Sequence, residues 1–109
     1  MATSTAGRDN FGDVNPAFAD YTDRVLFDEV WADPALPRRD RSLITVSALV
    51  MGYRVNELPA HFRIALGNGV TADELKALVT HLAFYAGWPA AATATGILRK
   101  VLAEMGEAA

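Results

Sequence analysis

The chain has 109 residues, of which 51% are hydrophobic and 21% are charged, and its formal net charge is −3. That length fits one domain, and the large apolar fraction argues against disorder. Because the sequence contains no cysteine, disulfides, thiolate metal sites and dithiol redox chemistry are excluded. Basic residues cluster only at positions 38–41, so a nucleic-acid partner is not expected.

The start of the chain is polar and lacks the apolar core of a signal peptide. No unbroken apolar run, residues 48–52 included, approaches the roughly 20 residues that a membrane helix needs. We therefore expect a cytoplasmic protein with no membrane partner. A domain this small leaves much of its surface exposed, so some of its apolar side chains are expected to pack against another subunit.

Residues 1–14 are polar, include two glycines and show no periodicity, which predicts a flexible N-terminal tail before a helical domain over residues 15–109. The first helix is expected to begin at Asn15-Pro16, a capping residue followed by proline. Apolar residues then recur at helical spacing as far as Trp31. A second, largely buried helix is expected from Asp40 to Gly52.

Three more helices are predicted in the second half of the chain. Asn56 is the expected cap of the third, which ends at the glycines of 67–69. Thr71 and Glu74 form a capping-box pattern that opens the fourth, and an alanine-rich fifth follows Trp88-Pro89. No segment favours a strand, so the predicted fold is all-α, with about five antiparallel helices.

Several polar residues among these helices are chemically suggestive. Glu57 and His61 are four positions apart, so they share a helix face. A carboxylate beside an imidazole is a workable proton-transfer pair near neutral pH. Arg54 and Arg63 lie close together in sequence, and their guanidinium groups are suited to binding an anionic substrate. His81 lies one turn before Tyr85. These residues also have explanations without a catalytic role. Glu57 and His61 can be a solvated surface pair, and Tyr85 and Trp88 can be aromatic residues of the core or of a subunit contact.

Four stretches carry a resemblance to a known family: residues 38–49, 57–61, 69–75 and 85–91, which read RRDRSLITVSAL, ELPAH, GVTADEL and YAGWPAA. In this order and spacing they resemble the carboxymuconolactone decarboxylase family, over roughly residues 16–104. The resemblance implies an all-helical, alkylhydroperoxidase-like fold. It also implies a homo-oligomer, a trimer or a hexamer, with active sites near subunit contacts.

The family has two branches, and the sequence distinguishes them. The peroxidase branch carries two cysteines and a histidine on the third helix, with a glutamate upstream. If His61 is that histidine, Arg54 and Glu57 stand at the cysteine positions, and Ser42 stands at the glutamate. Without a thiol, cysteine-dependent peroxidase chemistry is excluded. The cysteine-free chain resembles the decarboxylase branch, which acts on γ-carboxymuconolactone in protocatechuate breakdown through the β-ketoadipate pathway.

For that small anionic lactone no cofactor is expected, because the substrate itself accepts the electrons left by carbon dioxide. The protein must hold the carboxylates, stabilise the oxyanion and deliver a proton. The resemblance and the spacing assign His61 as the proton donor and Glu57 as the residue that orients it. The other expected site residues, which bind a carboxylate or line the pocket, are Arg41, Arg54, His81, Tyr85 and Trp88.

Two alternatives remain open at this point. In the first, a protein of this fold is a decarboxylase or isomerase that acts on a different small carboxylate or lactone. In the second, it is an oligomeric binding protein with no catalytic activity. An enzyme should hold Glu57, His61 and an arginine at a partly desolvated site, whereas a scaffold would leave them solvated.

Overall fold

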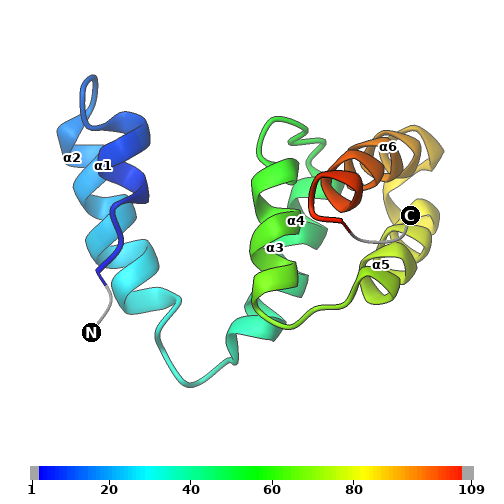
Figure 1. Ribbon diagram of the computed structural model, residues 1–109, viewed down its shortest axis with the longest axis horizontal. Helices are drawn as coiled ribbons and strands as arrows, with labels where there is room; N and C mark the ends of the chain where they lie inside the picture. Colours follow the sequence, from blue (N-terminus) through cyan, green and yellow to red (C-terminus); the bar gives the residue numbers. More distant parts are fainter. Residues whose placement is uncertain (1–2, 107–109) are drawn as a thin grey trace. The chain divides into compact units, whose positions relative to one another are not determined.

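The computed structural model describes residues 3–106, in which every regular element is a helix (Figure 1). Residues 1–2 and 107–109, the ends of the predicted tail and of the predicted domain, lie outside the described residues. The chain divides into two compact units, one up to residue 38 and one from residue 39 onward. The prediction of an all-α fold is confirmed.

The first unit contains α1 (Ala6–Phe11), α2 (Pro16–Asp20) and η1 (Tyr21–Val30). The predicted start at Asn15-Pro16 is confirmed, because the Asn15 side chain accepts a hydrogen bond from the Phe18 N–H at 3.1 Å. The helix continues without a break into η1, which has the wider i→i+5 hydrogen bonding of a π-helix. It ends where the Trp31 N–H donates to the Leu26 carbonyl at 3.0 Å.

Helix α1 lies within the stretch for which the sequence predicts a flexible tail, and no local pattern indicated it. Its first N–H groups are capped by a distant residue. The Asp23 carboxylate accepts hydrogen bonds from the Gly7 N–H at 2.7 Å and the Arg8 N–H at 2.9 Å. Gly7 also permits a close approach, since a Cβ there would lie 2.4 Å from the Ala19 carbonyl oxygen. Both features depend on the folded unit, so the sequence near α1 does not reveal them.

The second unit contains all of α3 (Arg38–Met51) except its first residue, together with α4 (Leu58–Gly67), α5 (Ala72–Ala86) and α6 (Trp88–Glu104). These four helices match the predicted ones, with two corrections at their starts. Helix α3 begins two residues before the predicted cap Asp40. The cap of α4 is Glu57 instead of Asn56, because the carbonyl of Arg54 accepts the Glu57 and Leu58 N–H groups and so places the helix start one residue later.

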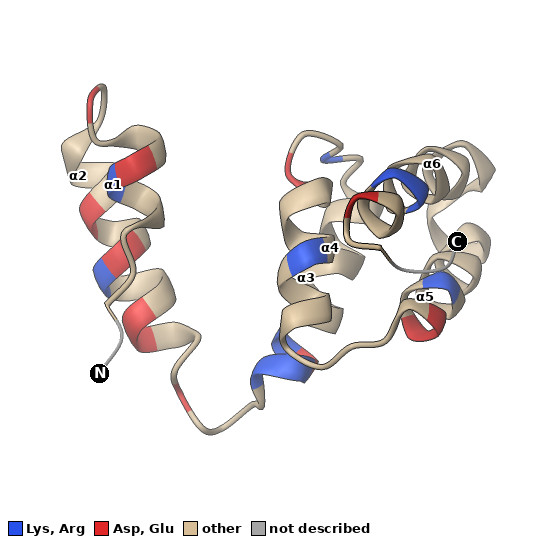
Figure 2. Cartoon of the chain, in the orientation of Figure 1, with Lys and Arg blue, Asp and Glu red and all other residues tan. Residues whose placement is uncertain are grey.

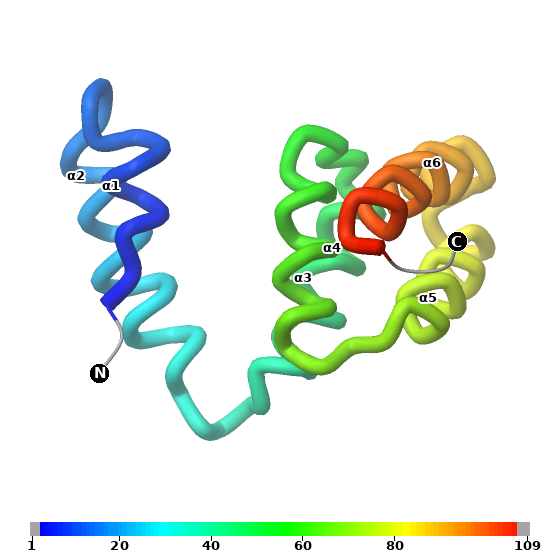
Figure 3. The backbone as a smooth tube through the Cα atoms, viewed as in Figure 1, coloured from blue at the N-terminus to red at the C-terminus, as the bar shows by residue number. Residues whose placement is uncertain are grey.

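Side-chain links show that consecutive helices of the second unit run in opposite directions, as the tube in Figure 3 also shows. An ion pair between Arg39 and Glu74 joins the first turns of α3 and α5. At the opposite end, the Tyr53 hydroxyl lies 3.1 Å from the Thr93 hydroxyl, which links the end of α3 to the beginning of α6. The ends of α3 and α5 and the beginnings of α4 and α6 therefore lie at one end of the bundle.

The core of the second unit is apolar and draws on all four helices. Its largest fully buried side chains include Phe62 and Leu58 of α4, Leu75 of α5, Leu102 of α6 and Val46 of α3. Every buried side-chain nitrogen or oxygen in the described residues has a hydrogen-bond partner. Among the helices described, none is both long enough and apolar enough to cross a membrane.

Candidate active site

The first turn of α4 carries the predicted proton-transfer pair. Glu57 is the capping residue and forms no side-chain hydrogen bond with the helix backbone. His61 follows one turn later, and its backbone N–H donates to the Glu57 carbonyl at 3.2 Å. Both side chains therefore lie on the same side of α4.

The two side chains have different environments. His61 is partly buried because Leu58 and Ala65, three positions before and four after it, point into the core. This burial lowers the pKa of His61 below its ordinary value of 6.5, and the negative charge of exposed Glu57 opposes that shift. The interaction is electrostatic, since no hydrogen bond or ion pair joins the two side chains within residues 3–106. A partly desolvated imidazole beside a carboxylate is suited to proton transfer.

The stripe of α4 that carries His61 is linked to α3 at its C-terminal end. Glu57, His61, Ile64 and Asn68 recur at helical spacing along it. At its far end the Asn68 amide donates to the Ser42 hydroxyl of α3 at 3.0 Å. Ser42 is buried, so this hydrogen bond satisfies its hydroxyl and links the end of α4 to the first part of α3. No local sequence pattern indicates this pairing, because it joins residues 26 positions apart.

The two candidate arginines lie at opposite ends of α3. Arg54 follows the helix, is exposed, and lies in the connection that leads directly to Glu57. Arg41 belongs to the basic stretch at the start of α3, seen in Figure 2. About 15 Å of helix separates Arg41 from the end of α3. Arg54 is therefore near the Glu57–His61 pair along the chain, whereas Arg41 lies at the far end of α3 beside Ser42.

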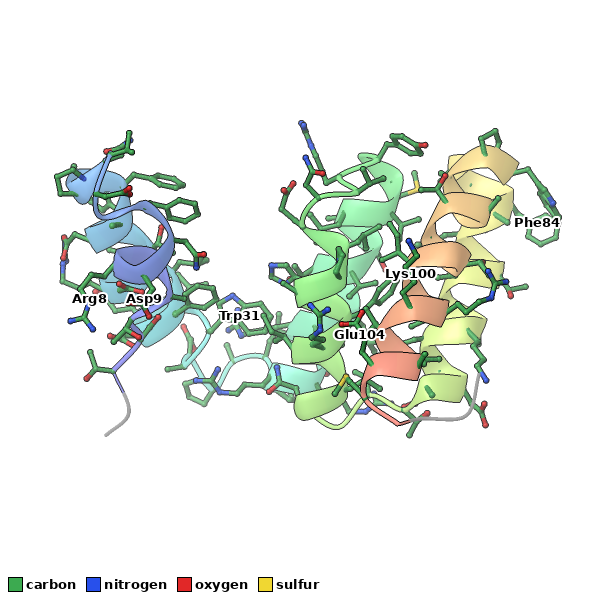
Figure 4. The ribbon with its side chains drawn as sticks, turned by 45° about the horizontal axis from the view of Figure 1, so that its top comes forward. Arg8, Asp9, Trp31, Phe84, Lys100 and Glu104 are labelled. Atoms are coloured by element: carbon green, nitrogen blue, oxygen red, sulfur yellow. The ribbon has the colours of Figure 1, made fainter. Side chains whose placement is uncertain are left out.

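The remaining candidates, His81, Tyr85 and Trp88, belong to two aromatic pairs at the end of α5 and the start of α6, which together with Phe84 are called the aromatic cluster below. The rings of His81 and Tyr85 lie 5.0 Å apart, and those of Phe84 and Trp88 meet edge to face at 5.5 Å. Three of these side chains are largely exposed: Phe84 (73%), Tyr85 (69%) and Trp88 (64%). Figure 4 shows Phe84 pointing away from the bundle. Phe84 was not predicted as a site residue, although its spacing from Trp88 is visible in the sequence.

A surface groove of about 230 Å³ runs between α5 and α6 beside this cluster. Phe84 and Trp88 line it, together with small residues such as Ala83 and Ala92. Of the predicted site residues, only Trp88 borders this groove. No hydrogen bond, ion pair or ring contact in the described residues joins the aromatic cluster to Glu57 or His61. The second unit thus holds two separate groups of candidates, both at the same end of the bundle.

The described residues contain no group of three or more histidine, aspartate or glutamate side chains that could hold a metal ion. The polar residues that precede His61 along the chain are Arg54, a guanidinium, and Glu57, a carboxylate that acts on its charge. Such an arrangement can bind an anion and exchange a proton with it.

Comparison with known proteins identifies the family. Residues 16–100 match the carboxymuconolactone decarboxylase family, and the chain belongs to it. A relative named 4-carboxymuconolactone decarboxylase, from Acinetobacter baylyi, is 41% identical over 98 residues, which are 90% of this chain and 73% of the relative.

A second relative is named nitrosuccinic acid decarboxylase and comes from Metarhizium robertsii. It is 37% identical over 76 residues, which are 70% of this chain and 53% of the relative. The chain thus spans about half the length of this second relative. Both relatives are named decarboxylases, which confirms the prediction of a carboxy-lyase and leaves its substrate to be determined.

Proposed function

We propose that this protein decarboxylates γ-carboxymuconolactone without a cofactor, and that His61 of α4 supplies the proton. The observation that carries the proposal is the Glu57–His61 pair, in which a partly buried imidazole lies under the influence of a carboxylate one turn away. The 41% identity to a protein named for this activity supports the choice of substrate.

The reaction needs little from the protein beyond positioning and one proton. The bond between the ring carbon and its carboxylate breaks, and carbon dioxide leaves without the electron pair. That pair is delocalised through the ring double bond onto the lactone carbonyl oxygen, which gives a dienolate. Imidazolium then donates a proton to a ring carbon and becomes neutral imidazole, and solvent restores its proton. The product is the β-ketoadipate enol-lactone.

The neighbouring residues are assigned by the chemistry that each can supply. The charge of Glu57 favours the protonated form of His61. Arg54 binds a substrate carboxylate, and we prefer it to Arg41 because it directly precedes the turn that carries Glu57. His81, Tyr85 and Trp88 line the pocket and limit the access of water, a role that requires a second surface to cover them.

A second candidate substrate is a small nitro-substituted dicarboxylate. The relative named nitrosuccinic acid decarboxylase favours this alternative. A nitro group beside the departing carboxylate can accept the electron pair, as the lactone does. The two substrates therefore place the same demands on the protein: an anion-binding residue and a proton donor.

The deciding experiment measures turnover of γ-carboxymuconolactone by the wild type and by His61→Gln, with nitrosuccinate tested in parallel. We expect the lactone to be consumed and the variant to be about 10²–10⁴-fold slower, with unchanged helicity by circular dichroism. Lys100→Gln, a change at an exposed position on α6, is the control and should retain activity. Full activity of His61→Gln would remove His61 from the mechanism, and turnover of nitrosuccinate alone would replace the substrate.

A further inference from the structure

The connection between α3 and α4 contains an unusual backbone conformation. Tyr53 has a φ of 55°, and it is the sole non-glycine residue with positive φ in the described part of the chain. Its N–H donates to the Val50 carbonyl at 3.1 Å, and the Arg54 N–H donates to the Leu49 carbonyl at 2.8 Å. This pair of hydrogen bonds defines a Schellman motif, whose left-handed position is usually glycine.

A tyrosine at this position is strained, because its Cβ crowds the backbone in the left-handed region. The adjacent glycine does not relieve the strain, since Gly52 lies one residue before the left-handed position. Gly52 has a separate role: a Cβ there would lie 3.2 Å from the Ala48 carbonyl oxygen and 3.5 Å from Cγ of Arg54. Gly52 therefore permits the close approach of the Ala48 carbonyl, while its distance to Arg54 is an ordinary contact. Tyr53, by contrast, keeps a conformation that glycine would adopt more readily.

The Tyr53 side chain makes one specific long-range contact. Its hydroxyl lies 3.1 Å from the Thr93 hydroxyl of α6, 40 positions along the chain. Tyr53 is 54% exposed, so burial of its ring does not by itself explain why a tyrosine occupies a strained position. The hydrogen bond anchors the turn to α6, a helix far from it in sequence.

The turn that Tyr53 fixes determines where α4 begins. The carbonyl of Arg54, the next residue, accepts the N–H groups of Glu57 at 3.2 Å and Leu58 at 3.3 Å. The Glu57 carbonyl in turn accepts the His61 N–H at 3.2 Å. A series of backbone hydrogen bonds thus leads from the Tyr53 turn to the backbone of His61.

We propose that Tyr53 is a positioning residue: its left-handed conformation, anchored to Thr93, sets the placement of Arg54 relative to the Glu57–His61 pair. Strained backbone that is retained at one point of a fold is characteristic of functional sites. The expected effect of Tyr53 on turnover rests on the proposed function. Its effect on the positions of Arg54 and His61 does not depend on which reaction the protein catalyses.

Three variants test the inference: Tyr53→Phe and Thr93→Val each remove one hydroxyl, and Tyr53→Gly also removes the strain. We expect each to lower turnover by about 10-fold, less than the roughly 100-fold cost of a 1 Å misplacement. Combining the two hydroxyl deletions should add little, because both remove the same hydrogen bond. Tyr21→Phe, which removes a hydroxyl from an exposed tyrosine of η1, is the matched control and should leave turnover unchanged.

Tyr53→Gly separates positioning from a purely structural role. Glycine adopts positive φ without strain, so this variant should unfold at the same denaturant concentration as the wild type or at a higher one. If Tyr53 were only a turn residue, the variant would be fully active. Reduced turnover in a protein of undiminished stability supports positioning, and full turnover overturns it.

A second measurement does not depend on turnover. The chain has two histidines, so proton NMR can follow His61 while His81 serves as the internal reference. Tyr53→Phe should loosen the start of α4, expose the imidazole to water and move its titration toward that of an ordinary histidine. An unchanged His61 titration overturns the inference. A changed titration in a protein that does not consume the lactone upholds the inference and overturns the proposed function alone.

Discussion

At the residue scale, the spacing of Glu57 and His61 could be predicted because helical periodicity alone places them on one face. The partial burial of His61 also follows from the apolar residues at positions 58 and 65. The conformation of Tyr53 could not be predicted, because a positive φ at a non-glycine residue reflects tertiary contacts and leaves no mark in the local sequence. The Asn68–Ser42 hydrogen bond was unpredictable for the same reason.

The influence of Glu57 on His61 can be read from the pH dependence of turnover. Burial lowers the pKa of His61, and Glu57 raises it. Because the proton donor must be protonated, the rate should fall as the pH rises through that pKa. Glu57→Gln removes the opposing charge, so the pKa of His61 should decrease and the falling limb of kcat/KM should move to lower pH.

The control for this prediction is Glu57→Asp, which keeps the negative charge and should keep the limb near its wild-type position. The limb is measured as kcat/KM against pH, beside the NMR titration of His61. A limb that stays in place in Glu57→Gln would show that the carboxylate does not influence the imidazole during turnover.

At the element scale, prediction succeeded where the capping signal is local. Thr71 and Glu74 form the predicted capping box of α5: the Thr71 hydroxyl accepts the Glu74 N–H at 3.1 Å, and the Glu74 carboxylate accepts the Thr71 N–H at 2.9 Å. The sequence did not predict α1, because the carboxylate that caps this helix belongs to Asp23, which is too far along the chain to form a local capping pattern.

Loss of the capping box should destabilise the protein without affecting the chemistry. Thr71→Ala removes the side-chain acceptor for an N–H group at the helix start, which should lower the free energy of unfolding by about 1 kcal/mol. Urea denaturation followed by circular dichroism measures this difference. Thr71→Ser keeps the hydroxyl and should remain close to the wild type; equal losses in both variants would mean that the cap is not responsible.

The attachment of α1 should depend on the charge of Asp23. Desolvation raises the pKa of this carboxyl, but hydrogen bonds from the Ser4 side chain and the Gly7 and Arg8 N–H groups outweigh it, and the pKa falls below its ordinary value. A lowered folded-state pKa stabilises the folded form above the unfolded pKa of about 3.9, and the stabilisation is lost as the pH falls through the folded value.

Amide hydrogen exchange tests this attachment. Asp23→Asn should accelerate exchange at Gly7 and Arg8 at neutral pH, because the charge-assisted hydrogen bonds weaken. Asp20→Asn, which disrupts only an exposed ion pair with Arg24, should not. If the amides of α1 exchange equally fast in wild type and Asp23→Asn, Asp23 does not hold the helix.

At the scale of the whole molecule, the two groups of candidate residues differ in how far they are exposed to solvent. His61 is partly buried within the second unit, whereas Phe84, Tyr85 and Trp88 are exposed. Adjoining exposed aromatics are uncommon on monomeric proteins and are typical of subunit contacts. The large apolar fraction of the sequence predicts an oligomer. It could not show which face of the second unit forms the subunit contact, because that face depends on how the four helices pack.

We therefore expect the protein to form a homo-oligomer, a trimer or a hexamer, through the face that carries Phe84 and Trp88. Replacing both with alanine removes two large exposed rings and a T-shaped contact, which should weaken association. Light scattering after gel filtration, over a range of concentrations, should show a smaller mass for the double variant. Met105→Ala, which removes an exposed apolar side chain at the other end of α6, should leave the mass unchanged. A monomeric wild type, or a double variant of wild-type mass, would contradict the assignment of this face and leave the exposed aromatics without a cover.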